Sequence, residues 1–348
     1  MHTRVVFTGG GTGGHVVPNL AVIEGLKKAE KGAEILYIGA TNGVEKAMVQ
    51  KAGIEYRGVA CGKLRRYFSL QNFTDFLKVP VGIWQAYRIL REFKPAVIFS
   101  KGGFVSVPVV IAARMLRIRV ILHESDLMPG LANRICARFA TKICMSFEES
   151  KPYFEKWGER VIFTGSPVRK CIFEGDAERG YKFTGFDKHR PILLVMGGSQ
   201  GAQQINELVR GALDELLKKF QIVHIRGRGN LDISLKRRGY QQYEYLDEPL
   251  KDIYAICEMI ISRGGANSLF EIALLKKKAL IIPLGNATRG EQVENARIFV
   301  GKLGWSMLSG EIKTADFLKS VEMAFESEVK GKLEFKNGTG EIVKLILA

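Results

Sequence analysis

The sequence predicts an α/β protein with two doubly wound domains, each a parallel sheet with helices on both faces. Short apolar runs alternate with segments of helical period, which is the pattern of successive βαβ units. The length of 348 residues suits about two domains at ~150 residues each. The pattern then pauses, and near residue 191 it starts again with a strand that is followed by a glycine loop. This restart indicates the beginning of a second domain.

In the first half of the chain, runs rich in Val and Ile are expected to form buried parallel strands. These strands are expected at Arg4–Thr8, Glu34–Ile38, Ala96–Ser100, Arg119–His123 and Lys142–Ser146. Helices are expected between them at Pro18–Lys31, Val105–Leu116 and Gly130–Phe139.

The pattern stops near Thr164, and residues 175–190 are polar and irregular. Strands are expected again at 191–196, Gln221–Ile225, Met259–Ser262 and Ala279–Pro283. We therefore predict one domain over 1–164 and a second over 165–330. Ligands bind at the carboxyl ends of parallel strands, so two such domains predict a central cleft between those ends.

Composition and charge narrow the class of protein. Hydrophobic residues make up 46% and charged residues 25% of the chain, which excludes a disordered or collagen-like protein. The chain carries 52 Lys and Arg against 36 Asp and Glu, a net charge of +16. Residues 1–164 hold 24 of the basic and 13 of the acidic residues, so +11 lies in the first half. This charge indicates an anionic partner, which is a nucleic acid, a phosphate ligand or an acidic lipid surface.

Cysteine usage and the apolar segments indicate a cytoplasmic protein that is soluble or rests on a membrane surface. The cysteines form no C-x-x-C pair, which argues for a reducing compartment and against a disulfide scaffold or zinc site. The beginning of the chain lacks the apolar core and cleavage site of a signal peptide. The most apolar stretch, 104–113, has about half of the ~20 residues that a membrane-spanning helix needs.

A glycine-rich loop, Gly9–Gly14, follows the first strand and precedes His15. It fits the G-x-G-x-x-G pattern, but the second strand ends at 37–40 without the acid that a dinucleotide fingerprint requires. No Gly-Lys-Ser/Thr follows, which excludes a P-loop. Such a loop lets backbone N–H groups approach an anion or a sugar, although a tight turn that needs glycine is the simpler explanation. His15 is a candidate general base, or else a histidine that caps or packs.

Two further segments of the first half place polar residues at strand ends. Lys101-Gly102-Gly103 follows one strand, and His123-Glu124-Ser125-Asp126 ends the next. The two acids and the histidine suggest a polar site. The alternative is a helix N-cap by Asp126 with Pro129 near the first helical position.

The second half repeats the strand–glycine–helix arrangement at 197–202 and 262–267. Helix starts there can bind a diphosphate without a metal, and Glu271 lies where a carboxylate can accept both ribose hydroxyls. Alternatively, Glu271 is a first-turn acid that complements the helix dipole. Gln292 and Asn295 form a further polar pair, which alone would be a solvated helix face. No Asp-x-Asp pair occurs, and this favours a diphosphate held by helix dipoles and Arg rather than by a metal.

A stretch that combines basic and aromatic side chains runs from Gly62 to Lys94. Only Asp75 and Glu92 oppose its positive charge. This mixture suits an anionic membrane surface. Two alternatives are a helix with core aromatics and a basic exposed face, and a site for single-stranded nucleic acid. The candidate membrane residues are Arg65, Arg66, Phe73, Phe76, Lys78 and Trp84.

These motifs, taken in order, resemble those of the MurG family over essentially the whole chain. The family comprises bacterial transferases that add N-acetylglucosamine to a lipid-linked muramoyl-pentapeptide in peptidoglycan synthesis. The matching segments are 9–15, 102–108, 123–133, 197–202 and 262–271, with Gln292 and Asn295.

The resemblance implies a GT-B fold, in which two Rossmann-like domains face a central cleft and the last helix, about 331–348, crosses back to the first domain. It implies UDP-N-acetylglucosamine as donor and an undecaprenyl-diphosphate-linked muramoyl-peptide as acceptor, with no metal and no other cofactor. It also implies a peripheral enzyme on the cytoplasmic face of the cell membrane, with roles in cell-wall biogenesis, cell shape and cell division.

The resemblance also implies roles for individual residues. Donor contacts are implied for Thr12, Gly13, Gly14, Asp126, Arg169, Ser199, Leu246, Ala266, Asn267, Ser268, Leu269, Glu271 and Gln292. Acceptor contacts are implied for Gly13, Gly14, Gly103, Phe104 and Ser106. Arg169 and Ser199 would meet the diphosphate, and His15 is the candidate base. The family's reaction inverts the anomeric centre, so the acceptor hydroxyl attacks without a covalent enzyme intermediate.

One departure concerns the acceptor side. The family often has Gln-Asn where this chain has Ser125-Asp126. The additional carboxylate makes Asp126 a second candidate base, or else indicates a different acceptor. Two other hypotheses stay open: a UDP-N-acetylglucosamine 2-epimerase on the same scaffold, and a basic nucleic-acid-binding module, which lacks any recognised motif.

Overall fold

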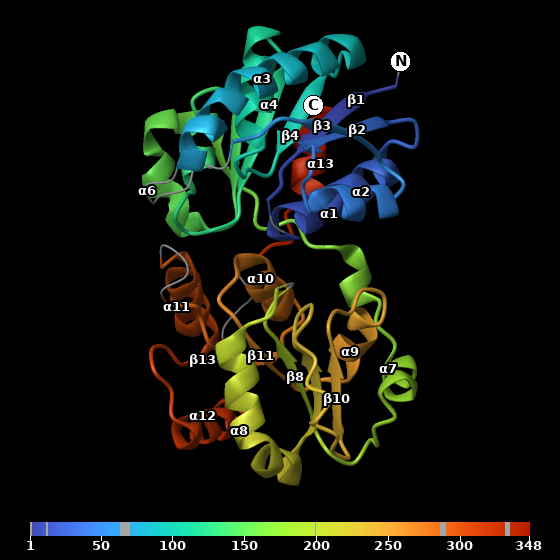
Figure 1. Ribbon diagram of the computed structural model, residues 1–348, viewed down its shortest axis with the longest axis vertical. Helices are drawn as coiled ribbons and strands as arrows, with labels where there is room; N and C mark the ends of the chain where they lie inside the picture. Colours follow the sequence, from blue (N-terminus) through green and yellow to red (C-terminus); the bar gives the residue numbers. More distant parts are fainter. Residues whose placement is uncertain (1, 12, 63–69, 199, 286–289, 331–334) are drawn as a thin grey trace. The chain divides into compact units, whose positions relative to one another are not determined.

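The computed structural model describes every residue except 1, 12, 63–69, 199, 286–289 and 331–334, and it leaves the side chains of 70–77 undescribed. The chain divides into two compact units. The first consists of Met1–Arg169 together with Lys336–Ala348, and the second is Lys170–Phe335. Figure 1 shows a layered α/β arrangement in each unit.

The first unit contains a seven-stranded parallel sheet in the order β3-β2-β1-β4-β5-β6-β7. Its strands are β1 (Arg4–Thr8), β2 (Glu34–Ala40), β3 (Glu55–Val59), β4 (Val97–Ser100), β5 (Arg119–Glu124), β6 (Lys142–Met145) and β7 (Val161–Phe163). From β1 to β3, successive strands are added on one side of β1, and from β4 onwards they are added on its other side. In a doubly wound sheet this change of side, between β1 and β4, is the switch point, where ligands bind outside the carboxyl ends of the strands.

Helices cover both faces of this sheet. One core cluster contains α3, α4 and α5, and the other contains α1, α2 and α13. The helices are α1 (Gly13–Ala29), α2 (Glu45–Lys51), α3 (Leu70–Phe93), α4 (Ser106–Met115), α5 (Leu131–Cys136), α6 (Lys151–Phe154) and α13 (Thr339–Leu347), with 3-10 turns η1 (Glu148–Ser150) and η2 (Glu155–Arg160).

The second unit contains a six-stranded parallel sheet in the order β10-β9-β8-β11-β12-β13. Its strands are β8 (Ile192–Met196), β9 (Gln221–Ile225), β10 (Tyr240–Tyr243), β11 (Met259–Ser262), β12 (Lys278–Ile281) and β13 (Ser306–Met307). Its helices are α7 (Ala177–Thr184), α8 (Gln203–Lys219), α9 (Leu250–Ile256), α10 (Ala266–Leu274), α11 (Glu291–Leu303) and α12 (Thr314–Glu326), with the 3-10 turn η3 (Lys170–Phe173). The switch point of this sheet lies between β8 and β11.

The central strands of both sheets are apolar on both faces, as the sequence predicted. All five residues of β8 are buried, with Leu193 and Val195 in the cluster under α8 and α12 and Leu194 buried outside that cluster. A strand covered on both sides needs a continuous apolar run rather than alternation. The prediction of two parallel α/β domains is confirmed.

Two predicted boundaries differ from the structure. Helix α1 begins at Gly13 rather than at Pro18, so His15 lies in its first turn and not in the loop before it. Pro18 removes one hydrogen bond from the helix without ending it. The units divide at Arg169, whereas the sequence pattern placed the junction after residue 164.

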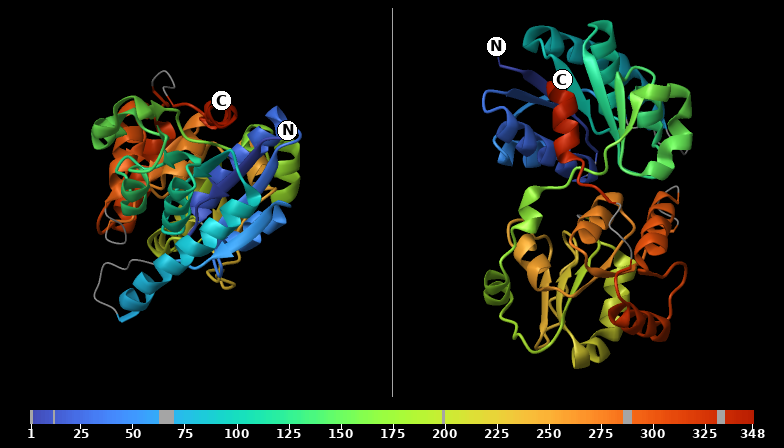
Figure 2. Two further views of the ribbon diagram at one scale, coloured as in Figure 1. Left: turned by 90° about the horizontal axis from the view of Figure 1, so that it is seen from above. Right: turned by 180° about the vertical axis from the view of Figure 1, so that it is seen from behind.

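The end of the chain completes the first unit. Ile342 and Ile346 of α13 are buried with Phe7 and Leu26 in the core against β1. Before this helix, Asn337 donates its Nδ2–H to the Val168 carbonyl at 3.0 Å. Figure 2, right, shows α13 lying within this unit.

Replacing Ile342 with Ala should destabilise the first unit by about 2–5 kcal/mol, because the change leaves a cavity at a fully buried position. Amide hydrogen exchange in β1 under increasing urea would measure this loss. The matched control is Lys344→Ala on the exposed face of the same helix, which should change stability by less than about 0.5 kcal/mol. Equal effects of the two variants would contradict the packing described here.

Candidate active site

The glycine loop after β1 is held by a buried carboxylate. Glu45, at the start of α2, has no exposed surface. Its Oε2 accepts the Gly11 N–H at 3.2 Å and its Oε1 accepts the Ala40 N–H at 2.8 Å. A Cβ atom on Gly10 would lie 2.4 Å from Oε1 of this carboxylate, so a larger residue there would displace the Glu45 side chain. The dinucleotide fingerprint places its acid at the end of the second strand, within 37–40, so Glu45 was not predicted. Its place shortly after β2, facing a glycine loop, is the signal that could have found it.

The loop after β4 packs directly against the loop after β1. A Cβ atom on Gly103 would collide with the Gly10 carbonyl, and one on Gly11 would lie 2.6 Å from Cε1 of Phe104. Gly103 also has φ of +82°, a conformation that favours glycine. Ser106 is fully buried and its hydroxyl donates to the Gly102 carbonyl at 2.8 Å. The predicted acceptor residues of this loop therefore lie together at the β1/β4 switch point. Ser106 stabilises the loop through its hydrogen bond to Gly102.

The segment that ends β5 is a network around Glu124, which is 4% exposed. Its Oε1 accepts the Asp126 N–H at 3.0 Å, and its Oε2 accepts the Gly130 N–H at 3.1 Å and the Asn133 Nδ2–H at 2.8 Å. Asp126 is half-buried and does not cap a helix, because α5 begins at Leu131 with Gly130 at the N-cap. The helix-cap interpretation of Asp126 is therefore wrong.

Burial and one cation set the protonation of this site. Lys101 is 1% exposed, and burial lowers the pKa of its ammonium to about 8. Burial, with Lys101 as a second cause, lowers the pKa of His15 to about 4, so the imidazole is neutral at physiological pH. Burial raises the pKa of Glu124 to about 7, with Asp126 adding to the effect.

In the second unit, polar residues of α11 hold the loops after β11 and β12. Gln292 is 9% exposed, and its Oε1 accepts the Leu284 N–H at 3.3 Å. Asn295 is fully buried and donates its Nδ2–H to the Gly264 carbonyl at 3.4 Å. A Cβ atom on Gly264 would collide with the Gln292 carbonyl. This pair is part of the loop's support and not a solvated helix face.

Glu271 lies inside α10 and is 8% exposed. Its Oε2 accepts the Tyr254 hydroxyl at 3.1 Å. No acid occupies the first turn of α10, so the helix-dipole interpretation of Glu271 is wrong. The first turn instead contains the predicted donor residues Ala266, Asn267, Ser268 and Leu269. Leu246, also predicted to meet the donor, is 7% exposed in this unit.

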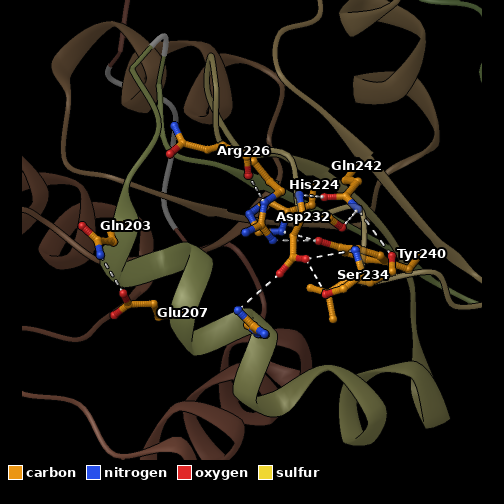
Figure 3. A network of polar contacts seen from close by, with 11 residues as sticks. Gln203, Glu207, His224, Arg226, Asp232, Ser234, Tyr240 and Gln242 are labelled. Carbon is orange, nitrogen blue, oxygen red and sulfur yellow. Dashed lines mark hydrogen bonds and ion pairs between the residues drawn. The ribbon is translucent and has the colours of Figure 1, made fainter.

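The loop after β8 lies on a buried polar network at the end of β9. His224 has two partners: its Nδ1 is 3.0 Å from the Tyr240 hydroxyl and its Nε2 is 2.9 Å from Asn206 Oδ1. Figure 3 shows polar contacts of this region, with His224, Arg226 and Tyr240 labelled. Asn206 donates its Nδ2–H to the Arg226 carbonyl at 3.1 Å. A Cβ atom on Gly201 would collide with that same carbonyl. The network thus fixes the backbone on which the glycine loop rests. Burial lowers the pKa of His224 to about 3, so it takes part as a neutral ring.

Arg263 connects the two loops of the second switch point. It follows β11, and its Nη1–H donates to the Gly201 carbonyl at 3.0 Å in the loop after β8. Arg169, which was predicted to meet the diphosphate, is half-buried and is the last residue of the first unit before the junction.

Part of helix α3 presents apolar and basic side chains to solvent. Trp84 is 58% and Val81 49% exposed, and the Arg88 guanidinium lies 4.9 Å from the centre of the Trp84 ring. Lys78 is also exposed. Of the other predicted residues, Thr12, Ser199, Arg65 and Arg66 lie outside the described residues, as do the side chains of Phe73 and Phe76.

Two features are absent from the part of the chain that the structure describes. No helix there is both long and apolar enough to cross a membrane. No group of three His, Cys, Asp or Glu side chains there has an arrangement that would hold a metal ion.

Comparisons with known proteins identify relatives along the whole chain. The glycosyltransferase family 28 N-terminal domain matches residues 5–145, and the C-terminal domain of the same family matches residues 192–328. A Bacillus cereus protein named UDP-N-acetylglucosamine–N-acetylmuramyl-(pentapeptide) pyrophosphoryl-undecaprenol N-acetylglucosamine transferase 2 is 48% identical, over 99% of this chain and 98% of its own. A Clostridium perfringens transferase of the same name, without the number, is 47% identical over 99% and 97%.

Solved structures share the fold. MurG of Acinetobacter baumannii superposes with a TM-score of 0.74 at 22% identity, covering 99% of each chain. The UDP-GlcNAc 2-epimerase of Methanocaldococcus jannaschii superposes with a TM-score of 0.68 at 15% identity, covering 100% of this chain and 99% of its own. These similarities confirm the predicted GT-B fold.

Replacing Glu45 with Ala should destabilise the first unit by about 2–4 kcal/mol, because two partly buried backbone N–H groups lose their acceptor. Urea unfolding followed by hydrogen exchange in β1 would measure the change. Lys46→Ala, at the exposed neighbouring position, is the control and should have an effect below about 0.5 kcal/mol. If both variants were equally stable, Glu45 would not support the loop.

Proposed function

The chain belongs to the MurG family of glycosyltransferases, and from this premise we propose that it transfers N-acetylglucosamine from UDP-N-acetylglucosamine to a muramoyl-pentapeptide on undecaprenyl diphosphate. The observation that carries the proposal is the 48% identity over 99% of the chain to a relative named for this transfer. The product is the disaccharide-peptide lipid used in peptidoglycan synthesis.

We assign the donor to the second unit. The N-terminal turn of α10 and the loop after β8 present backbone N–H groups at one switch point, where a diphosphate is favoured. Glu271 supplies a carboxylate for the ribose hydroxyls, and Arg169 supplies a cation for the diphosphate. We propose that this binding needs no metal ion and no further cofactor, since a guanidinium and helix starts neutralise phosphate charge themselves.

The acceptor belongs, in this proposal, to the loops after β1 and β4. Its hydroxyl attacks the anomeric carbon of the donor while the bond from that carbon to the UDP oxygen breaks. The configuration inverts, UDP leaves, and a base takes the hydroxyl proton. His15 in the first turn of α1 is neutral and can accept it. Asp126, at the end of β5, is the second candidate.

We propose that the enzyme is peripheral on the cytoplasmic face of the cell membrane. The exposed Trp84 and Val81 with the neighbouring basic side chains of α3 suit an anionic lipid surface. None of the five cysteines, all of them among the described residues, forms a disulfide, which suits a reducing compartment. The same surface is assigned to lipid and not to nucleic acid.

The test is transfer of labelled N-acetylglucosamine to a detergent-solubilised lipid-diphosphate muramoyl-peptide, with His15→Ala and Asp126→Asn assayed alongside the wild type. If His15 is the base, His15→Ala should lower kcat by about 100-fold or more while the KM for the donor changes less than about threefold. For the wild type, kcat/KM should hold as the pH falls from 7 towards 5, because His15 gains its proton only near pH 4.

Three outcomes would overturn part of this proposal. Folded protein that makes N-acetylmannosamine without any lipid acceptor would be a 2-epimerase, a reaction carried by structures of the same fold. An equal loss of kcat and donor affinity in His15→Ala would make His15 a binding residue. A loss of kcat confined to Asp126→Asn would move the base to Asp126.

Replacing Trp84 with Ser should weaken binding to vesicles that contain anionic lipid by about fivefold or more, with no loss of thermal stability, because the ring is mostly exposed. Vesicle sedimentation would measure this. Ile233→Ser removes another exposed apolar side chain, from the second unit, and should leave binding unchanged. A variant of Trp84 that unfolds would show that the ring is part of the core.

A further inference from the structure

The first unit buries a lysine between its two glycine loops. Lys101 follows β4 directly, and its backbone N–H donates to the Thr8 carbonyl at the end of β1, at 2.9 Å. Its side chain is 1% exposed, and a Cβ atom on Gly9 would lie 3.1 Å from the Lys101 Cβ. An ammonium in such a place is costly unless charged or polar groups face it.

The groups that face Lys101 come from the end of β5. Its Nζ donates a hydrogen bond to the Ser125 hydroxyl. The carboxylates of Glu124 and Asp126 both act to raise its pKa, against the effect of burial. The carboxylate of Glu124 is itself fixed by two backbone N–H groups and by the side-chain amide of Asn133. The segment 124–126 is therefore held both by these N–H groups and by the Lys101 ammonium.

The other titratable groups near Lys101 add no second cation. The proximity of Lys101 contributes to lowering the pKa of both His15 and His123, after burial, so both rings are neutral at physiological pH. Cys144 on β6 also interacts with Lys101, and burial raises the pKa of its thiol to about 12. Lys101 therefore balances Glu124 and Asp126.

We propose that Lys101 is a positioning residue of this site: its buried ammonium fixes the Ser125–Asp126 segment at the end of β5 through Ser125 and faces the carboxylates of Glu124 and Asp126. The pairing itself is independent of the reaction, whereas its effect on turnover rests on the proposed transferase function. One cation thus acts on both candidate bases. It attracts the carboxylate of Asp126, and it adds to the burial that lowers the pKa of His15.

The pairing is tested by a double-mutant cycle in the full chain, with Lys101→Met, Asp126→Asn and the combined variant unfolded by urea at pH 7.5. Lys101→Met alone should raise the unfolding equilibrium constant of the first unit by roughly 100-fold, because it leaves carboxylates buried without their cation. The combined variant should lie within about tenfold of the wild type, since Glu124, with its pKa of about 7, can take up a proton. Lys46→Met, at an exposed position, should have no effect.

Each outcome of the cycle decides the pairing. If Lys101→Met does not fold but the combined variant does, the pairing stands. If the two single effects multiply to give the combined effect, or if the combined variant is the least stable, Lys101 does not pair with Asp126. This measurement needs no substrate, so its result stands apart from that of the transfer assay.

The positioning role is tested by the pH dependence of kcat/KM in the transfer assay, for wild type and Lys101→Met at a temperature where both are folded. Loss of the cation makes protonation of His15 and of Asp126 easier. Whichever residue is the base, the fall of kcat/KM at acid pH should therefore begin about one pH unit or more higher in Lys101→Met than in the wild type. The KM for UDP-N-acetylglucosamine should change less than about threefold. An unchanged acid limb would limit Lys101 to a structural role, because a purely structural defect lowers the amount of active enzyme at every pH.

Discussion

The close approach of two backbones at the β1/β4 switch point is the constraint on which the first unit's site depends. The Gly10 and Gly103 backbones meet with no space for a side chain, and Glu45 fills the space behind Gly10. The residues of this unit that we propose to act in the reaction lie around that contact. It brings the first turn of α1, with His15, beside the end of β4, with Lys101, and both beside the end of β5.

The sequence predicted the fold well and the supports of the site poorly, for physical reasons. Strands buried on both faces read as apolar runs, so β9 and β11 were predicted to the residue. The edge strand β10, Tyr-Gln-Gln-Tyr, carries no apolar run and was missed. Glycine loops are local signals, but Glu45 acts on a loop 34 residues away, and spacing alone does not reveal such a contact. In the same way, Gln292 and Asn295 gave the pattern of an exposed helix face, although tertiary contact with Gly264 buries them.

The fold alone does not separate a transferase from an epimerase, whereas the sequence identity does. The transferase and the epimerase superpose on this chain almost equally well, with TM-scores of 0.74 and 0.68. Both reactions begin with the same sugar nucleotide, so a shared scaffold is expected to serve both. The near-half identity over the whole chain separates them. The transferase function also agrees with the first unit, which has a polar switch point of its own in addition to the one assigned to the donor.

The return of Lys336–Ala348 to the first unit has a consequence for how the protein is made. A ribosome synthesises the chain from its amino end, and a domain generally folds once its residues have emerged. Here the first unit lacks part of its core until residues 336–348 are translated, because Ile342 and Ile346 close the face of the sheet that includes β1. Until then, Phe7 and Leu26 lack apolar neighbours that cover them in the finished protein. The first unit to emerge is therefore the last to be completed, and a nascent chain stalled before residue 336 carries an open hydrophobic face that a chaperone can bind.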